Sequence, residues 1–184
     1  ERSKRIVGYL AKMKLSTVRI WTEKPDYSDI PDRDYDWKHT VYEEVKEVIP
    51  EDAPIPLGKE VILTSYVDAN LYHDVLTGRS VTGTLHLINK TPFNRYSKKQ
   101  GTVETATYGA EFVAARTAVE QIKANKLGLQ YLGVLVFQKL FLFGDNKSVM
   151  DFSSIPYAKL HKRHTALSFH RVREMIASNT LVFT

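Results

Sequence analysis

The sequence predicts an α/β domain in which helices cover a mixed sheet, and three observations lead to this fold class. Segments of strand length follow one another between residues 61 and 96. The spacing of apolar residues then changes to that of a long helix between residues 102 and 124. A second β-rich segment and shorter helical segments complete the chain of 184 residues. The predicted order of elements is βββαβαα, with a last strand at the C-terminal end.

The first predicted element is a short amphipathic helix. Apolar residues recur there at helical spacing: Ile6, Val7, Leu10 and Met13. Such a helix needs another surface to pack against. Because the chain opens without Met and stops inside the apolar run 181–183, we expect it to be a piece of a longer polypeptide.

The predicted strands begin with the mostly apolar run 61–67, which ends at Asp68. Residues 80–88 and 91–96 form two further strand candidates. Turn residues separate the strands: Thr77-Gly78 and Asn89-Lys90. Three strands in succession predict an antiparallel meander.

A long helix is predicted for residues 102–124. Its small and apolar side chains recur at helical intervals: Ala106, Ala110, Val113, Ala114, Ala118 and Ile122. Residues 134–143 are strongly apolar and β-rich, and they end in Gly144-Asp145-Asn146. Short helices are expected from Ser148 and from about residue 160 to 177, before a last strand at 181–183.

Residues 22–57 differ from the rest of the chain. Five of the seven prolines lie between residues 25 and 56, and no apolar period continues there. Residues 22–52 hold eleven Asp or Glu against four Lys or Arg, so their net charge is −7 and the remaining chain carries +12. A basic body with a separate acidic strip indicates either a polyanionic partner or a solvated surface.

Composition excludes several classes of protein. The chain has no cysteine, which excludes a disulfide scaffold, a zinc-thiolate site and a thiol enzyme. No apolar run approaches the roughly 20 residues of a membrane-spanning helix, and the first residues lead into no secretory signal. We therefore expect no membrane partner.

Three acids occupy unusual positions: Asp68 and Asp145 at the ends of apolar strands, and Glu111 among the apolar positions of the long helix. An unpaired carboxylate on a buried element costs free energy unless it is compensated, and a divalent cation compensates several at once. Carboxylate oxygens are the ligands that Mg²⁺ prefers. The alternative is that each acid caps a turn or pairs with a lysine. Glu104, seven residues upstream of Glu111, is expected to be a first-turn acid favoured by the helix dipole.

Short motifs in a fixed order and spacing carry a family resemblance. They are Tyr66-Val67-Asp68-Ala69-Asn70, Gly78-Arg79-Ser80-Val81-Thr82-Gly83, Ser97-Lys98-Lys99-Gln100, Ala110-Glu111-Phe112-Val113-Ala114, Phe143-Gly144-Asp145-Asn146-Lys147-Ser148, Lys162-Arg163-His164 and His170-Arg171-Val172-Arg173-Glu174. With these motifs, residues 61–184 resemble the ribonuclease H domain of copia-type retrotransposon Pol polyproteins (Pseudoviridae-like). Residues 2–14 resemble the helix that ends the preceding reverse transcriptase region.

The resemblance implies a ribonuclease H-like fold. This fold has a mixed five-stranded sheet, made of an antiparallel meander and parallel strands, with helices on both faces. It also implies three parts: residues 1–21 as the terminal helix of the reverse transcriptase or connection region, residues 22–57 as an acidic, proline-rich linker or insertion, and residues 58–184 as the ribonuclease H-like domain.

The implied activity is cleavage of the RNA strand of RNA·DNA hybrids during reverse transcription. Asp68, Glu111 and Asp145 match the metal-binding acids of the family, with Asp68 bridging two Mg²⁺ ions, or Mn²⁺ in their place. The implied partners are the hybrid and the reverse transcriptase domain of the same polyprotein. The implied location is intracellular, in a cytoplasmic virus-like particle or the nucleus.

One position departs from the family pattern. Family members carry a fourth acid just after the Lys-Arg-His motif, where this chain has Ala166. His164 is the candidate for moving a proton or aiding product release, because an imidazole does either near neutral pH. The departure favours an alternative function, in which a decayed or domesticated, inactive module serves as a structural or nucleic-acid-binding part of a larger assembly.

Candidate substrate contacts lie near the proposed acids. The basic ones are suited to phosphates and the small polar ones to a ribose 2′-hydroxyl. They are Asn70, Arg79, Ser97, Lys98, Lys99, Asn146, Lys147, Lys162 and Arg163.

Overall fold

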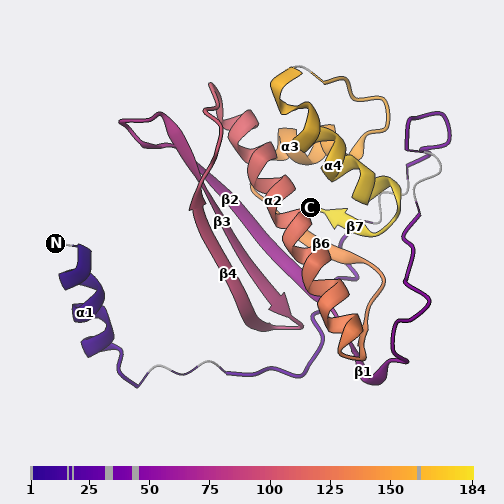
Figure 1. Ribbon diagram of the computed structural model, residues 1–184, viewed down its shortest axis with the longest axis horizontal. Coiled ribbons are helices and arrows are strands. Elements are labelled where there is room, and N and C mark those ends of the chain that lie inside the picture. Colours follow the sequence, from indigo (N-terminus) through magenta and orange to yellow (C-terminus); the bar gives the residue numbers. More distant parts are fainter. Residues whose placement is uncertain (1, 16, 18, 32–34, 43–45, 161–162) are drawn as a thin grey trace.

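The computed structural model of the chain describes residues 2–15, 17, 19–31, 35–42, 46–160 and 163–184. Its centre is a five-stranded sheet with the strand order β4-β3-β2-β6-β7 (Figure 1). These strands are β2 (Leu63–Asp74), β3 (Arg79–Ile88), β4 (Thr91–Lys99), β6 (Leu140–Phe143) and β7 (Leu181–Phe183). The antiparallel meander β2-β3-β4 is continued by β6, parallel to β2, and by β7, parallel to β6. The predicted mixed sheet is therefore confirmed.

Strand β2 extends further than the sequence predicted. It continues to Asp74, which pairs with Arg79 of β3, so Asp68 lies within the strand and not at its end. Beyond Asp68 the strand alternates between buried Ala69 and exposed Asn70. The apolar run ends early because one face of this part of the hairpin is open to solvent, while cross-strand pairing still holds the backbone.

The apolar run 134–143 forms two strands where one was predicted. β5 (Val134–Val136) pairs with β1 (Leu57–Val61) in a separate parallel sheet, and β6 pairs with β2. The chain turns between β5 and β6 because the two parts of the run have different partner strands.

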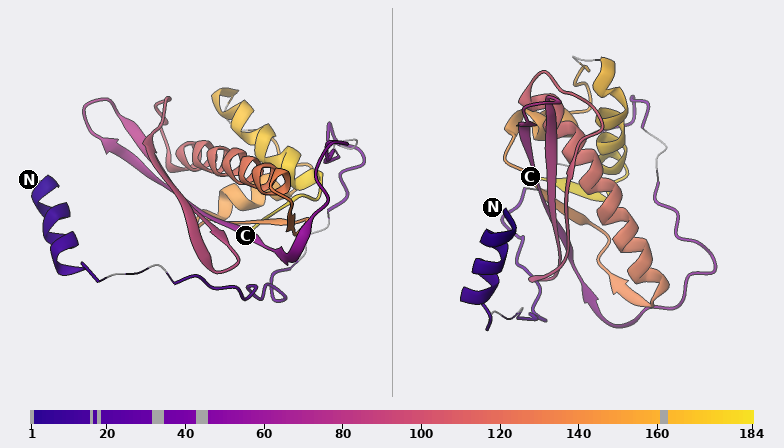
Figure 2. Two further views of the ribbon diagram at one scale, coloured as in Figure 1. Left: turned by 60° about the horizontal axis from the view of Figure 1, so that its bottom comes forward. Right: turned by 60° about the vertical axis from the view of Figure 1, so that its left-hand side comes forward.

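Three helices, α2 (Thr107–Tyr131), α3 (Lys147–Ser154) and α4 (Ala166–Ala177), pack together. α2 lies on β2 and β3, α4 packs on α2, and α3 contacts both helices (Figure 2). In the part of the chain that the structure describes, these helices form one layer on one face of the sheet, where we expected helices on both. None of the described helices is both long and apolar enough to cross a membrane.

The ends of the helices differ from the prediction. α2 begins after Ala106, whose backbone is extended (φ −151°, ψ 153°), and it continues past residue 124 to Tyr131. The chain leaves the helix at Leu132 and Gly133, and the positive φ of Gly133 (75°) favours glycine. The helix predicted for about 160–177 is shorter, because a 3-10 turn, η1 (Arg163–Thr165), precedes α4.

The hydrophobic core lies between the sheet and α2. Leu63, Val67 and Ala69 of β2 are buried in one cluster with Phe112 and other apolar residues of α2. β3 adds polar groups to this layer, of which the fully buried His86 is the largest. Its Nδ1 lies 2.5 Å from Ser65 Oγ and its Nε2 lies 2.9 Å from Gln121 Oε1. Burial lowers the pKa of His86, which favours a neutral ring in this layer.

The predicted N-terminal helix is present as α1 (Arg2–Lys12) and lies apart from the sheet in Figures 1 and 2. Its residues Val7 and Tyr9 are exposed. The segment that follows packs on the body: the Tyr27 ring lies 4.5 Å from that of Phe141, and Trp37 covers Arg173. The division of the chain at residues 21 and 57 stays a prediction.

Candidate metal centre

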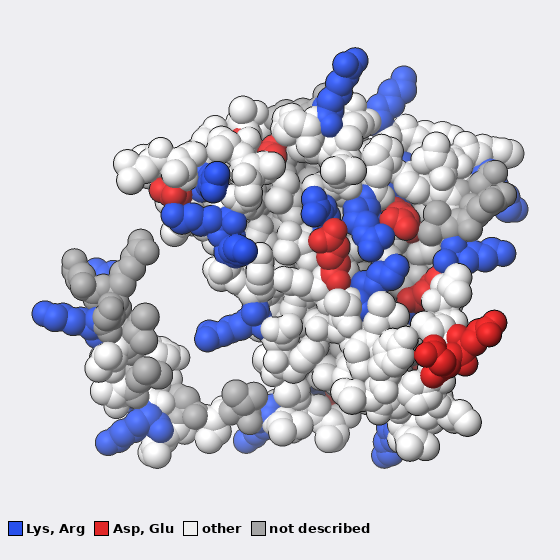
Figure 3. All heavy atoms as spheres, viewed as in Figure 1, with Lys and Arg blue, Asp and Glu red and all other residues white. Residues whose placement is uncertain are grey.

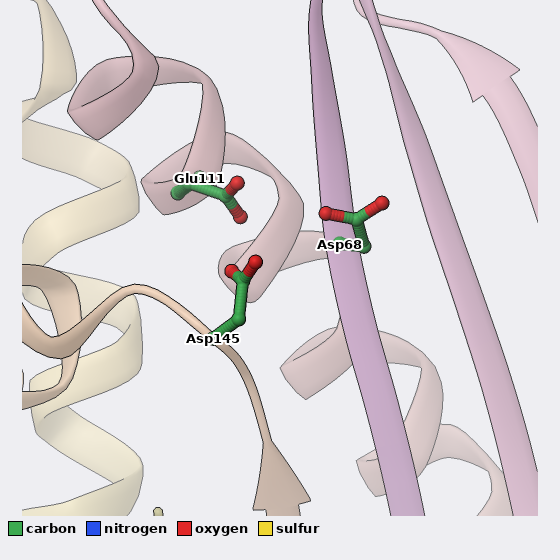
Figure 4. A group of neighbouring side chains, drawn as sticks. All are labelled: Asp68, Glu111 and Asp145. Atoms are coloured by element: carbon green, nitrogen blue, oxygen red, sulfur yellow. The ribbon is translucent and has the colours of Figure 1, made fainter.

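Three carboxylates meet at one point of the molecule (Figure 4). They belong to Asp68 of β2, Glu111 of α2 and Asp145, which follows β6. One oxygen from each lies within 4.8 Å of the other two. Asp68 and Asp145 are exposed, whereas Glu111 is buried. The predicted convergence of the three side chains is confirmed, and their role stays a prediction.

The end of β6 makes this meeting possible. β6 pairs with β2 only as far as Tyr66 and Phe143, so β6 covers no part of the β2 edge beyond Tyr66, where Asp68 lies. Open α/β sheets bind ligands outside the carboxyl ends of parallel strands such as these two. A Cβ atom on Gly144 would lie 3.1 Å from the ring of Phe183. Glycine therefore lets the chain pass close to β7 just before Asp145.

Glu111 reaches this edge from the second turn of α2. The backbone N–H of Ala69 donates a hydrogen bond to its carboxylate. Burial raises the pKa of Glu111 to about 7, helped by the charges of Asp145 and Asp68, while the Ala69 hydrogen bond acts in the opposite direction. Full ionisation of the trio without a counterion is therefore unfavourable.

The three residues fit a divalent cation. Among the described residues, none of the three carboxylates forms an ion pair with a lysine or arginine. A cation would offset their mutual repulsion and the burial of Glu111. Carboxylate oxygens suit Mg²⁺ and Mn²⁺, which complete their shells with water and substrate oxygens.

Some of the predicted substrate contacts share a face of the sheet with Asp68. Asp68 is opposite Gly83 on β3, which is opposite Ser97 on β4. One pleat further on, Asn70 and Lys99 are connected in the same way through β3. Residues directly opposite one another project to the same face, so Asn70, Ser97 and Lys99 lie on the face of Asp68. The Lys99 ammonium also pairs with Asp74 at 2.7 Å.

A groove of about 520 Å³ lies between the meander, α2 and the start of α4. Its basic lining residues are Arg79, Lys98, Lys99 and Arg116, and His164 lies at its η1 side. Figure 3 shows Lys and Arg side chains spread over the face in view, with fewer acidic ones between them. The groove therefore suits a polyanion.

The remaining predicted contacts have other surroundings. The Asn146 side chain caps α3 by accepting a hydrogen bond from the Val149 N–H at 3.2 Å. Lys147 and Arg163 are exposed. Lys162 lies outside the described residues. The proposed contacts of these side chains with nucleic acid stay predictions.

His164 lies beside Glu104 and is not a member of the acid cluster. Its Nε2 is 2.8 Å from Glu104 Oε2. The expectation that Glu104 lies in the first turn of the long helix is wrong, because α2 begins at Thr107 and Glu104 precedes it. The Glu104 side chain is also buried, at 1% exposed. The Glu104 carboxylate is buried beside His164 and next to the first turn of α2.

Ala166 is the first residue of α4, and the first turn of that helix has no acidic residue. The acid cluster that could hold a metal ion has three members among the described residues, Asp68, Glu111 and Asp145.

The sequence interpretation missed two residues of the groove. Gln100 is 4% exposed, and its amide donates to Thr82 Oγ1 and to the Ala110 carbonyl. Arg116 lines the groove from α2. In the sequence Gln100 is only the last residue of the motif 97–100, and its hydrogen bond to the Ala110 carbonyl, next to Glu111, depends on tertiary contacts. For Arg116, the only feature of the sequence that could have indicated a place in the groove is its position five residues after Glu111.

The fold is similar to that of solved ribonuclease H structures. A ribonuclease H1 isolated from compost by a metagenomic approach, LC11-RNase H1, superposes with a TM-score of 0.50 and 17% identity. The match covers 67% of this chain and 82% of that one. A second structure of LC11-RNase H1, in complex with an RNA/DNA hybrid, matches with a TM-score of 0.50 and 17% identity over 66% of this chain and 83% of that one. The chain therefore has the ribonuclease H fold.

The sequence resembles a retrotransposon polyprotein, as its motifs indicated. It is 29% identical over 124 residues to the retrovirus-related Pol polyprotein from transposon TNT 1-94 of Nicotiana tabacum. The alignment covers 67% of this chain, and the chain spans 9% of the length of that relative. No family model matches the chain.

Proposed function

We propose that this chain is a metal-dependent endonuclease that cuts the RNA strand of RNA·DNA hybrids, within a retrotransposon Pol polyprotein and beside its reverse transcriptase. The observation that carries the proposal is the convergence of Asp68, Glu111 and Asp145 to within 4.8 Å at the open edge of β2. The ribonuclease H fold and the similarity to a Pol polyprotein support the same activity.

The three carboxylates are proposed to hold the metal ions. Two divalent ions, when bound, supply Lewis acidity that lowers the pKa of water and neutralises the scissile phosphate. Asp68 and Asp145 offer exposed carboxylates, whereas Glu111 is fixed by burial and by the Ala69 N–H. Glu111 must lose its proton to become a ligand, so we expect metal binding to release a proton near neutral pH.

His164 is proposed to move a proton during cleavage. Its side chain is 52% exposed at the groove, and its Nε2 faces Glu104. With the Nε2–H donating to the Glu104 carboxylate, Nδ1 would be the atom that exchanges a proton with substrate or water.

The hybrid is proposed to lie across the open sheet face and the groove. Asn70 and Ser97 lie on the face of Asp68 and are suited to a ribose 2′-hydroxyl, which distinguishes RNA from DNA. Arg79, Lys98 and Lys99 line the groove and are suited to phosphates. Shape and backbone contacts of this kind predict little dependence on base sequence.

A second candidate function is binding without cleavage. Ala166 favours it, since this residue occupies the place of the fourth acid and the first turn of α4 offers no replacement. In that case the module would contribute a hybrid-binding surface to a larger assembly.

The test is cleavage of an RNA·DNA hybrid labelled on the RNA strand, with Mg²⁺ or Mn²⁺. The wild-type chain is compared with Asp68→Asn and Asp145→Asn, and with Glu120→Gln as a control acid on α2, outside the trio. The cleavage rate of each Asp variant is expected to fall by on the order of 100-fold or more, while the variant still binds the hybrid. Glu120→Gln should cut like wild type, and EDTA should abolish cutting.

Double-stranded DNA and RNA of the same sequence serve as substrate controls and should stay intact. If the folded wild-type chain binds the hybrid but does not cut it with either metal, the nuclease proposal fails and the binding function replaces it.

A further inference from the structure

We propose that Glu104 is a positioning residue that orients His164 for proton transfer, and that Gly109 provides the space for its carboxylate. The inference rests on the proposed nuclease function and assigns a role to a buried acid outside the metal cluster.

The contact joins a buried acid to an exposed base. Glu104 is 1% exposed, and its Oε2 lies 2.8 Å from His164 Nε2. Its other oxygen accepts a hydrogen bond from Thr102 Oγ1 at 3.2 Å. The carboxylate therefore has a defined orientation, in which one oxygen is directed at His164.

Glu104 is distinctive among the residues that line the groove. Within the described part of the chain it is the only acidic lining residue. The charged or titratable residues that line the groove with it are Arg79, Tyr96, Lys98, Lys99, Arg116 and His164. A buried carboxylate needs a compensating donor, and the imidazole supplies it. Burial thus fixes the Glu104 side chain, and the contact with Glu104 orients the half-exposed His164 ring.

The contact determines which ring nitrogen of His164 faces the groove. With Nε2 donating to Glu104, Nδ1 is left for substrate or water. In Ser-His-Asp hydrolases, a buried carboxylate likewise holds the tautomer and orientation of the catalytic imidazole. Glu104 would have the same relation to His164 and would not touch the reacting atoms itself.

Gly109 is necessary for this arrangement. An ideal Cβ at residue 109 would lie 2.3 Å from Glu104 Oε2, which no real contact allows. Gly109 lies in the first turn of α2, two residues before Glu111. The same helix therefore supports one metal-cluster acid and leaves room for the acid that orients His164.

The first test follows the imidazole itself and does not require activity. In chain labelled with ¹⁵N-histidine, the His164 Nε2–H proton should give a resonance protected from solvent exchange. Glu104→Ala should remove this resonance, and so should Gly109→Ala, which retains both partners. Glu47→Gln, which removes the carboxylate paired with buried Lys126 outside this groove, should leave it unchanged. A protected resonance that persists in Glu104→Ala would overturn the proposal.

The second test follows hybrid cleavage. His164→Ala is expected to lower kcat on the order of 100-fold, and Glu104→Ala by about 10-fold or more, each with little change in KM. In the His164→Ala background, Glu104→Ala should cause no further loss, because Glu104 acts through His164. A positioning role is excluded if the two losses multiply, or if Glu104→Ala cuts as fast as wild type.

The two proposals fail in distinguishable ways. If wild type does not cut but shows the Nε2–H resonance, the nuclease function is contradicted. The contact between Glu104 and His164 is then present without a catalytic role. Normal cutting by Glu104→Ala together with inactive Asp68→Asn contradicts the role of Glu104 alone. Thermal unfolding of each variant identifies any loss that is due to misfolding, with Glu47→Gln as the matched loss of a buried ion pair.

Discussion

The guanidinium of Arg173 on α4 lies 4.8 Å from the ring centre of Trp37, in the segment that precedes the sheet. Arg173 is 2% exposed and donates to the carbonyls of Phe152, Ile155 and Pro156. Tyr42 covers it from the same segment. Part of the acidic segment therefore encloses a buried cation of the body.

Replacing Trp37 should destabilise the fold. Trp37→Ala removes a ring that is 9% exposed and opens Arg173 to water, so we expect a loss of about 3 kcal/mol in the free energy of unfolding. Urea denaturation followed by circular dichroism measures it. The control is Trp21→Ala, because Trp21 is 42% exposed and should cost less than about 1 kcal/mol. A loss for Trp37→Ala as small as that expected for Trp21→Ala would show that the Trp37 ring does not support the body.

Divalent cations should stabilise the native chain. At a Mg²⁺ concentration about ten times its Kd, binding to the native state should raise Tm by roughly 3–6 °C. Differential scanning calorimetry with and without EDTA measures this shift. Asp145→Asn should lose it, whereas Glu120→Gln, an exposed acid of α2 paired with Arg116, should keep it. An undiminished shift in Asp145→Asn would remove this acid from the metal site.

Without divalent cations, Glu111 should make stability depend on pH. Its pKa is about 7 in the folded chain, above the ordinary value of 4.5, so the folded state binds the proton more tightly than the unfolded state. The contribution to stability is complete below about pH 4.5 and is lost as pH rises through about 7. The loss amounts to at most about 3 kcal/mol.

Glu111→Gln isolates this contribution. The difference in unfolding free energy between wild type and Glu111→Gln, measured in EDTA, should change in that pH range and be constant above it. The control is Glu60→Gln, which removes an acid paired with Lys24 at 2.8 Å. A flat difference for Glu111→Gln would mean that this acid is ionised throughout, against the assigned burial effect.

Hybrid affinity should depend on salt through the cations of the groove. Lys98→Gln should weaken binding at low salt and reduce the slope of log K against log salt by about 1. Fluorescence anisotropy across a salt series measures it, with Asp68→Asn present in both chains to prevent cutting. Lys90→Gln is the matched control, because Lys90 lies in the turn at the other end of the β3-β4 hairpin. If Lys98→Gln and Lys90→Gln change the salt slope equally, the hybrid does not bind at the groove.

Much of the site is accessible from the sequence because its signals are local. A strand-length apolar run beside Asp68, a glycine before Asp145 and helical spacing around Glu111 each reflect the element that carries the acid. The exact ends of those elements were not accessible. β2 continues past its apolar run because β3 pairs with it. The run 134–143 divides because its first part pairs with β1 and its last part pairs with β2.

The sequence alone determined the kind of sheet, the long helix and the identity of the three acids that meet at the edge of β2. It could do so because periodicity and the placement of charged residues are local features of the sequence. The tertiary structure alone decided that Glu104 is buried against His164, that Trp37 covers Arg173, and that Glu111 holds its proton up to about pH 7. These features depend on burial and on charges from residues distant in sequence, and neither is encoded in any single stretch of it.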